Sequence, residues 1–439
     1  MIDRRSMLAG TAALAASPVL ARTSAPRPLD PVFPQGFLWG ASTAGHQVEG
    51  NNLNADLWPV EHATPSVFRT PSGDAANSLD LWEQDLDLAK AIGLNAYRFG
   101  LEWSRIEPEQ GQFSQAMIDH YGRIIAGCHA RGLTPIVTYN HYTTPRWFAA
   151  RGGWLGADSA ALFARFAETV TRRIGDGIAM AITLNEPNIL PVLRTILPPP
   201  VWDIQAATLA ATARSLGLPR YICANVARLE DVDGIVAGQV AGHKAARAAI
   251  KSVRGNLPVG LSLSVFDDQA VGKNSIRDKM RQELYGPFLG LVREDDFVGV
   301  QNYERVMWGD KGRLPPPPGA VLNGAGVEVY APSLAGAVRY IHAETGRKIL
   351  VSEHGVNTPD DRIRAAFISA ALPELKRAMD DGVQVLGYCH WSLIDNFEWI
   401  FGYGPKLGLA SFDPVTFVRT PKPSAAVLGA IARANRLPS

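Results

Sequence analysis

The stretch AITLNEPN, residues Ala181–Asn188, runs apolar for several positions and then ends on Glu186, between Asn185 and Pro187. Proline cannot donate a ladder hydrogen bond, and it favours extended backbone in the residue before it. The pattern therefore predicts a strand that ends at a carboxylate, with Glu186 in extended geometry. A single Glu-Pro pair at a strand end is more often a solvent-exposed acid, so a function for Glu186 requires a partner.

Apolar runs of this kind recur along the chain. Most are short and continuously apolar rather than alternating, as is typical of parallel strands that are buried on both faces. The runs are FLWGAS at 37–42, NAYRFGL at 95–101, TPIVTYN at 134–140, MAITLNE at 180–186, LPVGLSLS at 257–264, FVGVQNY at 297–303, KILVSEHG at 348–355 and VQVLGYCHWSL at 383–393.

Amphipathic stretches separate these runs and predict helices. They cover residues 78–92, 114–131, 159–174, 235–253 and 361–381. Alternating strands and helices without a break in composition predict an α/β fold, a single (β/α)8 TIM barrel over residues 30–439. The proline-rich runs at 197–200 and 315–319 are predicted to be surface loops.

Composition and charge exclude several classes of protein. The chain has 439 residues, with 43 Lys and Arg against 42 Asp and Glu, and no block of like charge stands out. We therefore expect neither a nucleic acid nor an anionic membrane as a partner. The three cysteines (Cys128, Cys223 and Cys389) form no C-x-x-C pair, which excludes a zinc knuckle or a thioredoxin-like motif.

The first 25 residues have the pattern of an export signal. Arg4 and Arg5 precede a run rich in alanine and leucine, and a plausible small-residue cleavage site follows. The paired arginines resemble a twin-arginine signal, which a receptor reads before the segment is removed. This segment predicts a periplasmic or secreted protein that has no membrane association once the signal is removed.

A possible partner for Glu186 ends the seventh apolar run. Glu353 in KILVSEHG is a second carboxylate at a strand end, and parallel strands of a closed barrel would direct both acids to one mouth. Paired carboxylates across a cleft catalyse glycoside hydrolysis, in which one protonates the leaving oxygen and the other attacks the anomeric carbon or activates a water molecule.

Residues that suit sugar binding are predicted at the same strand ends. Sugar hydroxyls require amide and carboxylate partners, and the apolar face of a pyranose requires an aromatic platform. Each residue alone has an ordinary structural explanation, but their joint position favours a sugar site. The candidates are Gln47, His141, Asn185, Tyr303, Trp391, Glu398 and Trp399.

From about Phe33 to the C-terminus, the sequence resembles the family-one glycoside hydrolases, the group of retaining β-glucosidases. Five motifs carry the resemblance, in family order: FLWGASTAGHQVEG, NAYRFGLEWSRIEPEQG, TLNEPN, VSEHGV and GYCHWSLIDNFEWIFGYG. The resemblance implies a (β/α)8 barrel that uses no cofactor and no metal. It also implies an exo-acting retaining β-glycosidase, most simply a β-glucosidase, whose partner is a small-molecule or oligosaccharide β-glycoside.

The resemblance also implies roles for individual residues. Glu186 matches the acid/base, and Glu353 matches the nucleophile. Retention through these two carboxyl groups requires a separation of roughly 5 to 5.5 Å. The residues that match positions holding the nonreducing sugar are Gln47, His141, Asn185, Trp391, Glu398 and Trp399. Those expected beside the nucleophile are Arg98, Asn302 and Tyr303.

Several positions depart from the family pattern. His354 replaces the usual Asn after the nucleophile, and we expect its imidazole to alter the electrostatics there. Tyr142 stands where many members have Trp. The segment 189–233 does not match the family's Gly-rich pattern, so the leaving group stays open. Glu398 would repel a phosphate, which favours a neutral sugar, glucose first.

Alternatives stay open at this point. Galactose or fucose could replace glucose, and a transglycosidase would use the same two glutamates. A sugar-binding protein without catalysis would be expected to lack one of the glutamates, and neither is missing. A cofactor-bearing oxidoreductase is disfavoured, because no G-x-G-x-x-G motif follows a predicted strand. The sequence does not predict an oligomeric state.

Overall fold

All of the apolar runs form parallel strands of one closed barrel in the computed structural model, which describes residues 29–438. The strands, in barrel order, are β1 (Leu38–Ser42), β2 (Ala96–Gly100), β3 (Thr134–Asn140), β4 (Met180–Asn185), β5 (Val259–Ser264), β7 (Phe297–Asn302), β9 (Ile349–His354) and β10 (Val385–Trp391). β10 pairs with β1 and closes the barrel. The (β/α)8 prediction is confirmed.

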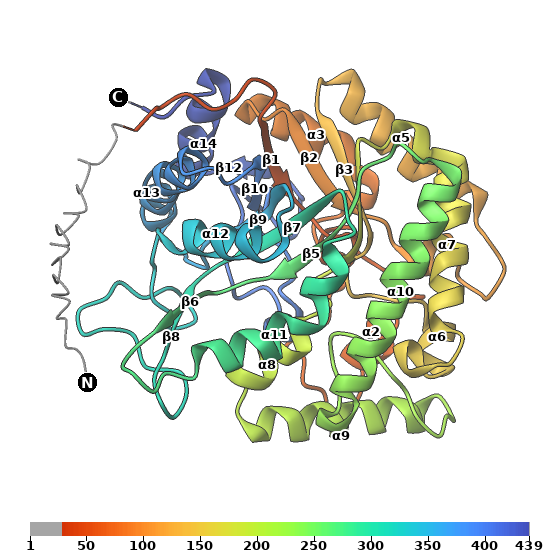
Figure 1. The fold of residues 1–439 in the computed structure, drawn as a ribbon. Coiled ribbons are helices and arrows are strands. Elements are labelled where there is room, and N and C mark those ends of the chain that lie inside the picture. The colour runs from red at the N-terminus through yellow and green to blue at the C-terminus, as the bar shows by residue number, and fades with distance from the viewer. Residues whose placement is uncertain (1–28, 439) are drawn as a thin grey trace, which may run out of the picture.

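Helices surround the barrel, as Figure 1 shows. They are α3 (Ser78–Ile92), α5 (Gln115–Ala130), α7 (Ser159–Ile174), α10 (Val232–Val253), α11 (Arg277–Val292), α12 (Ser333–Thr345), α13 (Asp361–Asp380) and α14 (Pro423–Ala434). Ser114 caps α5 by accepting a hydrogen bond from the backbone N–H of Met117. α7 turns Leu162, Phe166 and Val170 inward at helical spacing, so its apolar face covers the barrel.

Further elements lie in the connections. They are α1 (Gly45–Val48), α2 (Leu57–Glu61), α4 (Trp103–Ile106), α6 (Arg146–Ala150), α8 (Ile189–Ile196), α9 (Pro199–Ser215), the 3₁₀ turns η1 (Gly153–Leu155), η2 (Gly175–Gly177), η3 (Leu229–Asp231) and η4 (Trp399–Phe401), and the strand pairs β6 (Asp267–Ala270) with β8 (Arg305–Trp308) and β11 (Ala410–Phe412) with β12 (Arg419–Pro421).

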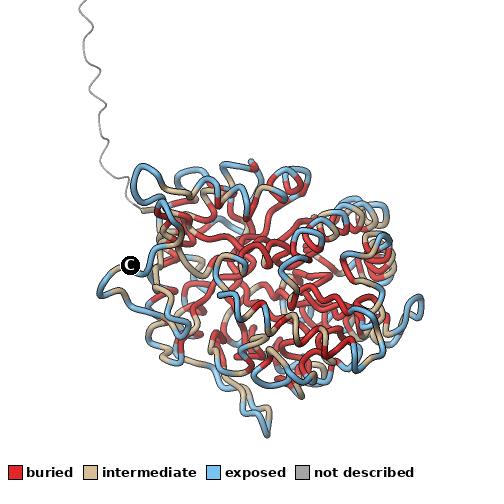
Figure 2. Tube along the Cα trace, turned by 90° about the horizontal axis from the view of Figure 1, so that it is seen from below, coloured by how far each residue is buried: buried red, intermediate tan, exposed pale blue. Residues whose placement is uncertain are grey.

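The barrel strands are almost entirely buried, and Figure 2 shows the buried segments gathered in the centre of the molecule. An apolar cluster with Ile136, Met180, Ile182, Phe297 and Leu350 includes the early parts of several strands. These side chains close the amino-terminal end of the barrel. The carboxyl end is therefore the part left for polar side chains.

Two local predictions were wrong. The proline run at 197–200 is not wholly a loop, because α9 begins at Pro199. Proline suits the first helical turn, where its missing N–H would have no helical partner. The run at 315–319 lies outside helices and strands, as predicted.

The second wrong prediction concerns the backbone of Glu186, which is left-handed rather than extended, with φ of 41°. Its N–H still donates to the carbonyl of Ser262 on β5 (2.9 Å), while its carbonyl accepts from Ile189 at the start of α8 (2.9 Å). The chain must keep a ladder bond and turn into a helix within three residues, and this requirement overrides the preference set by Pro187.

Residues 1–25, the predicted export signal, lie outside the described residues. Within residues 29–438, no helix is both long enough and apolar enough to cross a membrane. Cys128, Cys223 and Cys389 are all buried free thiols.

Candidate active site

The carboxyl ends of the barrel strands surround a cavity of about 290 Å³. It brings together nine of the residues predicted from the sequence, which come from six different barrel strands or the loops that follow them. They are Gln47, His141, Asn185, Glu186, Tyr303, Glu353, Trp391, Glu398 and Trp399. A binding site at this end is what a (β/α)8 barrel provides.

Glu353 lies near the end of β9, and only 4% of its surface is exposed. Three side chains donate to its carboxylate: Arg98 (2.6 Å) and Gln301 (2.8 Å) to Oε1, and Tyr303 (2.5 Å) to Oε2. Burial raises the pKa of Glu353 above its usual value, and the positive charge of Arg98 and the hydrogen bonds from Tyr303 and Arg98 oppose that rise. The carboxyl group is therefore fixed in position and supported as an anion.

Arg98 on β2 is completely buried beneath the cavity. Besides Glu353, it donates to Asn185 Oδ1 (2.5 Å) and to Thr138 Oγ1 (3.1 Å). The Asn185 amide nitrogen in turn lies 3.2 Å from His141 Nε2. One guanidinium thus fixes residues from three other strands, because its planar array of donors suits several acceptors at once.

Glu186 follows β4 directly and belongs to the same cavity. Burial raises its pKa to about 8, and the negative charge of Glu353 adds to the effect. The Tyr142 hydroxyl donates to Glu186 Oε2 and opposes that rise. At neutral pH the Glu186 carboxyl group is therefore available as a proton donor in the same cavity as Glu353.

Polar atoms without a partner among residues 29–438 mark the polar end of the cavity. Gln47 donates from Nε2 to the Phe397 carbonyl (2.8 Å) and to Asn396 Oδ1 (3.1 Å), but its buried Oε1 has no partner. The buried His141 Nδ1 is also unpartnered. Buried polar atoms without partners are rare, so both atoms are suited to bind ligand hydroxyls.

Glu398 completes this polar end. It accepts a hydrogen bond from Trp391 Nε1 (3.1 Å), and burial raises its pKa to about 8. The aromatic rings form a continuous surface beside it. His141 stacks on Trp391 (5.5 Å between centroids) and on Trp399 (6.1 Å). The result is an aromatic platform next to hydroxyl-binding groups, which suits a pyranose.

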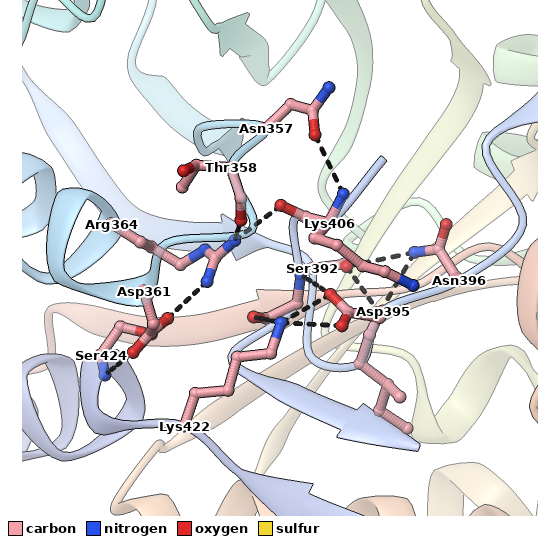
Figure 3. A network of polar contacts seen from close by, with 12 residues as sticks. Asn357, Thr358, Asp361, Arg364, Ser392, Asp395, Asn396, Lys406, Lys422 and Ser424 are labelled. Atoms are coloured by element: carbon pink, nitrogen blue, oxygen red, sulfur yellow. Dashed lines mark hydrogen bonds and ion pairs between the residues drawn. The ribbon is translucent and has the colours of Figure 1, made fainter. Parts of the chain in front are cut away.

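The segment from Trp391, the last residue of β10, to Glu398 is held by the polar network drawn in Figure 3. Lys422 Nζ contacts both oxygens of Asp395 (2.7 and 2.8 Å). Asn396 donates to Ser392 Oγ (3.1 Å) while accepting from Gln47. These bonds limit movement of the loop and therefore preserve the geometry of the polar end.

One predicted site residue lies elsewhere. Asn302 donates to the carbonyls of Val265 (2.8 Å) and Glu304 (3.1 Å) and does not contact Glu353. Its neighbour Gln301 makes that contact and also donates to Asn185 Oδ1 (2.7 Å). Side chains alternate along a strand, so Gln301 shares a face with Tyr303 whereas Asn302 does not. This alternation was the signal available in the sequence.

His354 also differs from expectation. Its ring stacks on Phe367 of α13 (4.7 Å), and its Nδ1 lies 3.0 Å from the Tyr388 hydroxyl. Burial lowers its pKa to about 3, so the imidazole is neutral. The expected electrostatic effect on Glu353 is therefore wrong, because His354 packs between the barrel and a helix and carries no charge there.

Comparisons with known proteins agree with this geometry. A profile of Glycosyl hydrolase family 1 matches residues 29–214 and 323–437. The β-glucosidase of Agrobacterium sp. is 30% identical over 93% of this chain and 96% of its own length. Among solved structures, the apo β-glucosidase 1317 is 40% identical with a TM-score of 0.87, over 91% of this chain and 98% of that one.

A second solved structure, the β-glycosidase BGL167, is 41% identical with a TM-score of 0.86, covering 93% of this chain and 98% of its own. The profile match spans most of the barrel, and it includes the strands that carry both glutamates. The chain therefore belongs to glycosyl hydrolase family 1.

Proposed function

We propose that the protein is a retaining β-glucosidase in which Glu353 is the nucleophile and Glu186 is the acid/base. One observation carries the division of roles. Glu353 accepts hydrogen bonds from Arg98, Gln301 and Tyr303, whereas the pKa of Glu186 is raised to about 8 in the same cavity. Two carboxyl groups in such different environments suit an anion that attacks and an acid that donates.

The reaction then takes two steps. Glu353 attacks the anomeric carbon as the glycosidic C–O bond breaks, and Glu186 transfers its proton to the departing oxygen. Glu186, now a carboxylate, removes a proton from water. That water attacks the anomeric carbon, and the bond to Glu353 breaks. Two inversions give net retention of configuration.

A neutral sugar suits the polar end of the cavity. Gln47 Oε1 and His141 Nδ1 have no protein partner, and Glu398 adds a carboxyl group that can accept from a hydroxyl. The similarity to a relative named as a β-glucosidase supports glucose in first place. A sugar-binding protein without catalysis is less consistent with two glutamates held in one cavity.

The test is hydrolysis of p-nitrophenyl β-glucoside, β-galactoside and β-fucoside, with NMR detection of the first anomer released. We expect the glucoside to be cleaved with the highest kcat/KM and to release β-glucose first. Release of α-glucose first would contradict the retaining mechanism. Absence of turnover on all three glycosides would overturn the proposed function. A preference for the galactoside or the fucoside would assign that sugar to the substrate in place of glucose.

Tyr142 is expected to act as a positioning residue for Glu186. Its hydroxyl donates to Glu186 Oε2, which favours the carboxylate and lowers its pKa. In Tyr142→Phe the pKa of Glu186 should therefore rise further. The free energy of a hydrogen bond to a charged group corresponds to a pKa shift of about one unit. We therefore expect the alkaline limb of the kcat/KM profile to move upward by about one pH unit.

Tyr139→Phe is the matched control for this prediction. Tyr139 lies on the same segment, and its hydroxyl is 2.8 Å from Thr171 Oγ1 rather than near a glutamate. Its loss should leave the pH profile unchanged. An alkaline limb that stays in place or moves downward in Tyr142→Phe would show that the bond does not control the protonation of Glu186.

A further inference from the structure

Part of the cavity lining is apolar, in contrast to the polar end around Gln47 and Glu398. It is formed by two separate segments, α8 with the residue that follows it and the chain from η4 onward. The apolar residues are Ile189, Leu193, Leu197, Ile400, Phe401 and Leu407. We call this set the apolar wall.

Helical spacing explains the first side of the apolar wall. Ile189, Leu193 and Leu197 are four residues apart, so they share one face of α8 and its end. α8 starts three residues after Glu186, which places this face directly beside the acid/base. On another face of α8, Arg194 is exposed and pairs with Asp233 (3.1 Å).

The second side of the apolar wall, formed by the segment around Phe401, lies at the mouth of the cavity. Phe401 is 47% exposed although it lines the cavity, and the Arg69 guanidinium lies 5.8 Å from its ring centroid. Gly402 follows with φ of 62°, and an added Cβ would meet Thr70 Oγ1 at 2.3 Å. Only glycine suits this turn, which directs the Phe401 segment back along the cavity.

Three amide side chains, Gln205, Asn225 and Asn357, line the cavity beside the apolar wall. The side-chain oxygen of Gln205 already accepts from the Ala227 N–H (3.1 Å), and that of Asn357 accepts from the Lys406 N–H (2.9 Å). The described residues that line the cavity include three carboxyl groups, those of Glu186, Glu353 and Glu398. Glu186 and Glu353 are the proposed catalytic pair, and Glu398 marks the polar end. A second sugar ring here would bring several hydroxyls against alkyl and phenyl carbons, which cannot replace the hydrogen bonds to water.

We infer that the leaving group of the natural substrate is apolar, an aryl or alkyl alcohol rather than a second sugar. The inference rests on the proposed function, because it assigns the apolar wall to the part of a β-glucoside beyond Glu186. Burial of the leaving group against these side chains would provide binding energy in proportion to its apolar area. The glucose unit would occupy the polar end.

The test is calorimetric binding of S-linked glucosides, which are not hydrolysed, to the wild-type protein. Methyl and hexyl β-thioglucoside differ only in methylene groups, and each fully buried methylene is worth roughly a three- to fourfold gain in affinity. We expect hexyl β-thioglucoside to bind at least about 30-fold more tightly than the methyl compound. It should also bind more tightly than a thio-linked cellobioside.

Substitutions in the apolar wall test whether its side chains cause the difference in affinity. Phe401→Ala, at a half-exposed position, and Leu193→Ala should each lower the hexyl-to-methyl affinity ratio by about fivefold or more. Arg194→Gln, on another face of the same helix, is the control and should leave the ratio unchanged. A ratio near one in the wild type, or tighter binding of the thiocellobioside, would overturn the inference.

This measurement is separate from the test of the proposed function. Affinity ratios for uncleaved ligands do not depend on turnover. If the inference fails, the affinity will therefore not increase from methyl to hexyl β-thioglucoside. Failure of the proposed function appears instead as absence of hydrolysis in the p-nitrophenyl assays.

Discussion

Glu353→Ala is expected to lower kcat for p-nitrophenyl β-glucoside by roughly 10⁴-fold or more, because the substitution removes the group that forms the covalent intermediate. Arg98, Gln301 and Tyr303 all donate to this carboxylate, so the substitution also removes one hydrogen-bond acceptor from each of them. Steady-state kinetics on the purified variant measures the effect, with thermal unfolding as a check on folding.

Azide gives this prediction a direct control. In Glu353→Ala, azide can enter from the face that the carboxylate occupied, so activity should recover and the product should be the α-glucosyl azide, inverted at the anomeric carbon. Full activity of the variant without azide would show that Glu353 is not the nucleophile. A β-glucosyl azide would assign the other role to this residue.

Glu186→Ala is expected to lose activity in a way that depends on the leaving group. General acid catalysis contributes about 10² to 10⁴-fold, and we expect the full loss for alkyl glucosides, whose alkoxide leaves poorly without a proton. With 2,4-dinitrophenyl β-glucoside the first step needs little assistance, so the loss should be much smaller. Comparing kcat/KM on the two substrates measures the difference.

For this variant azide should yield the β-glucosyl azide, because it attacks the covalent intermediate on Glu353 and configuration is retained. Glu186→Gln, which keeps an acceptor for Tyr142, should show the same dependence on the leaving group. An equal loss on both substrates would argue that the substitution damages binding rather than proton transfer.

Much of this site could be predicted from the sequence because its parts are local. Glu186 and Glu353 each end an apolar run, and a closed parallel barrel directs such ends to one mouth. The motif at the end of the chain placed Trp391, Glu398 and Trp399 correctly at the cavity. None of these placements depends on knowing how one strand is aligned with the next.

The predictions that were wrong or missed concern features that are set by the register between strands and by close packing. The register between β7 and β9 shifts between Val300 and Gln301, and this shift pairs Gln301 with Glu353. Asn302 lies one residue further on and therefore faces away. His354 likewise follows Glu353 by one residue and packs on Phe367. The hydrogen bond from Tyr142 to Glu186 joins two loops, and no single segment of sequence contains that information.

The raised pKa values in the cavity also affect folding. In the folded protein the pKa values of Glu186 and Glu398 are both about 8, whereas an unfolded glutamate ionises near 4.3. The native state binds more protons than the unfolded state between these values. The contribution of these two groups to stability is thus fully present below about pH 4, is lost as pH rises, and reaches its lower limit above about pH 8.

Glu398→Gln should therefore unfold at a temperature that depends less on pH than that of the wild type. The gain over the wild type should grow from pH 5 to pH 8, whatever the constant offset caused by the new amide. A difference in unfolding temperature that does not change with pH would contradict this expectation. The two carboxyl groups that equip the cavity for sugar chemistry thus make the folded state less tolerant of alkali.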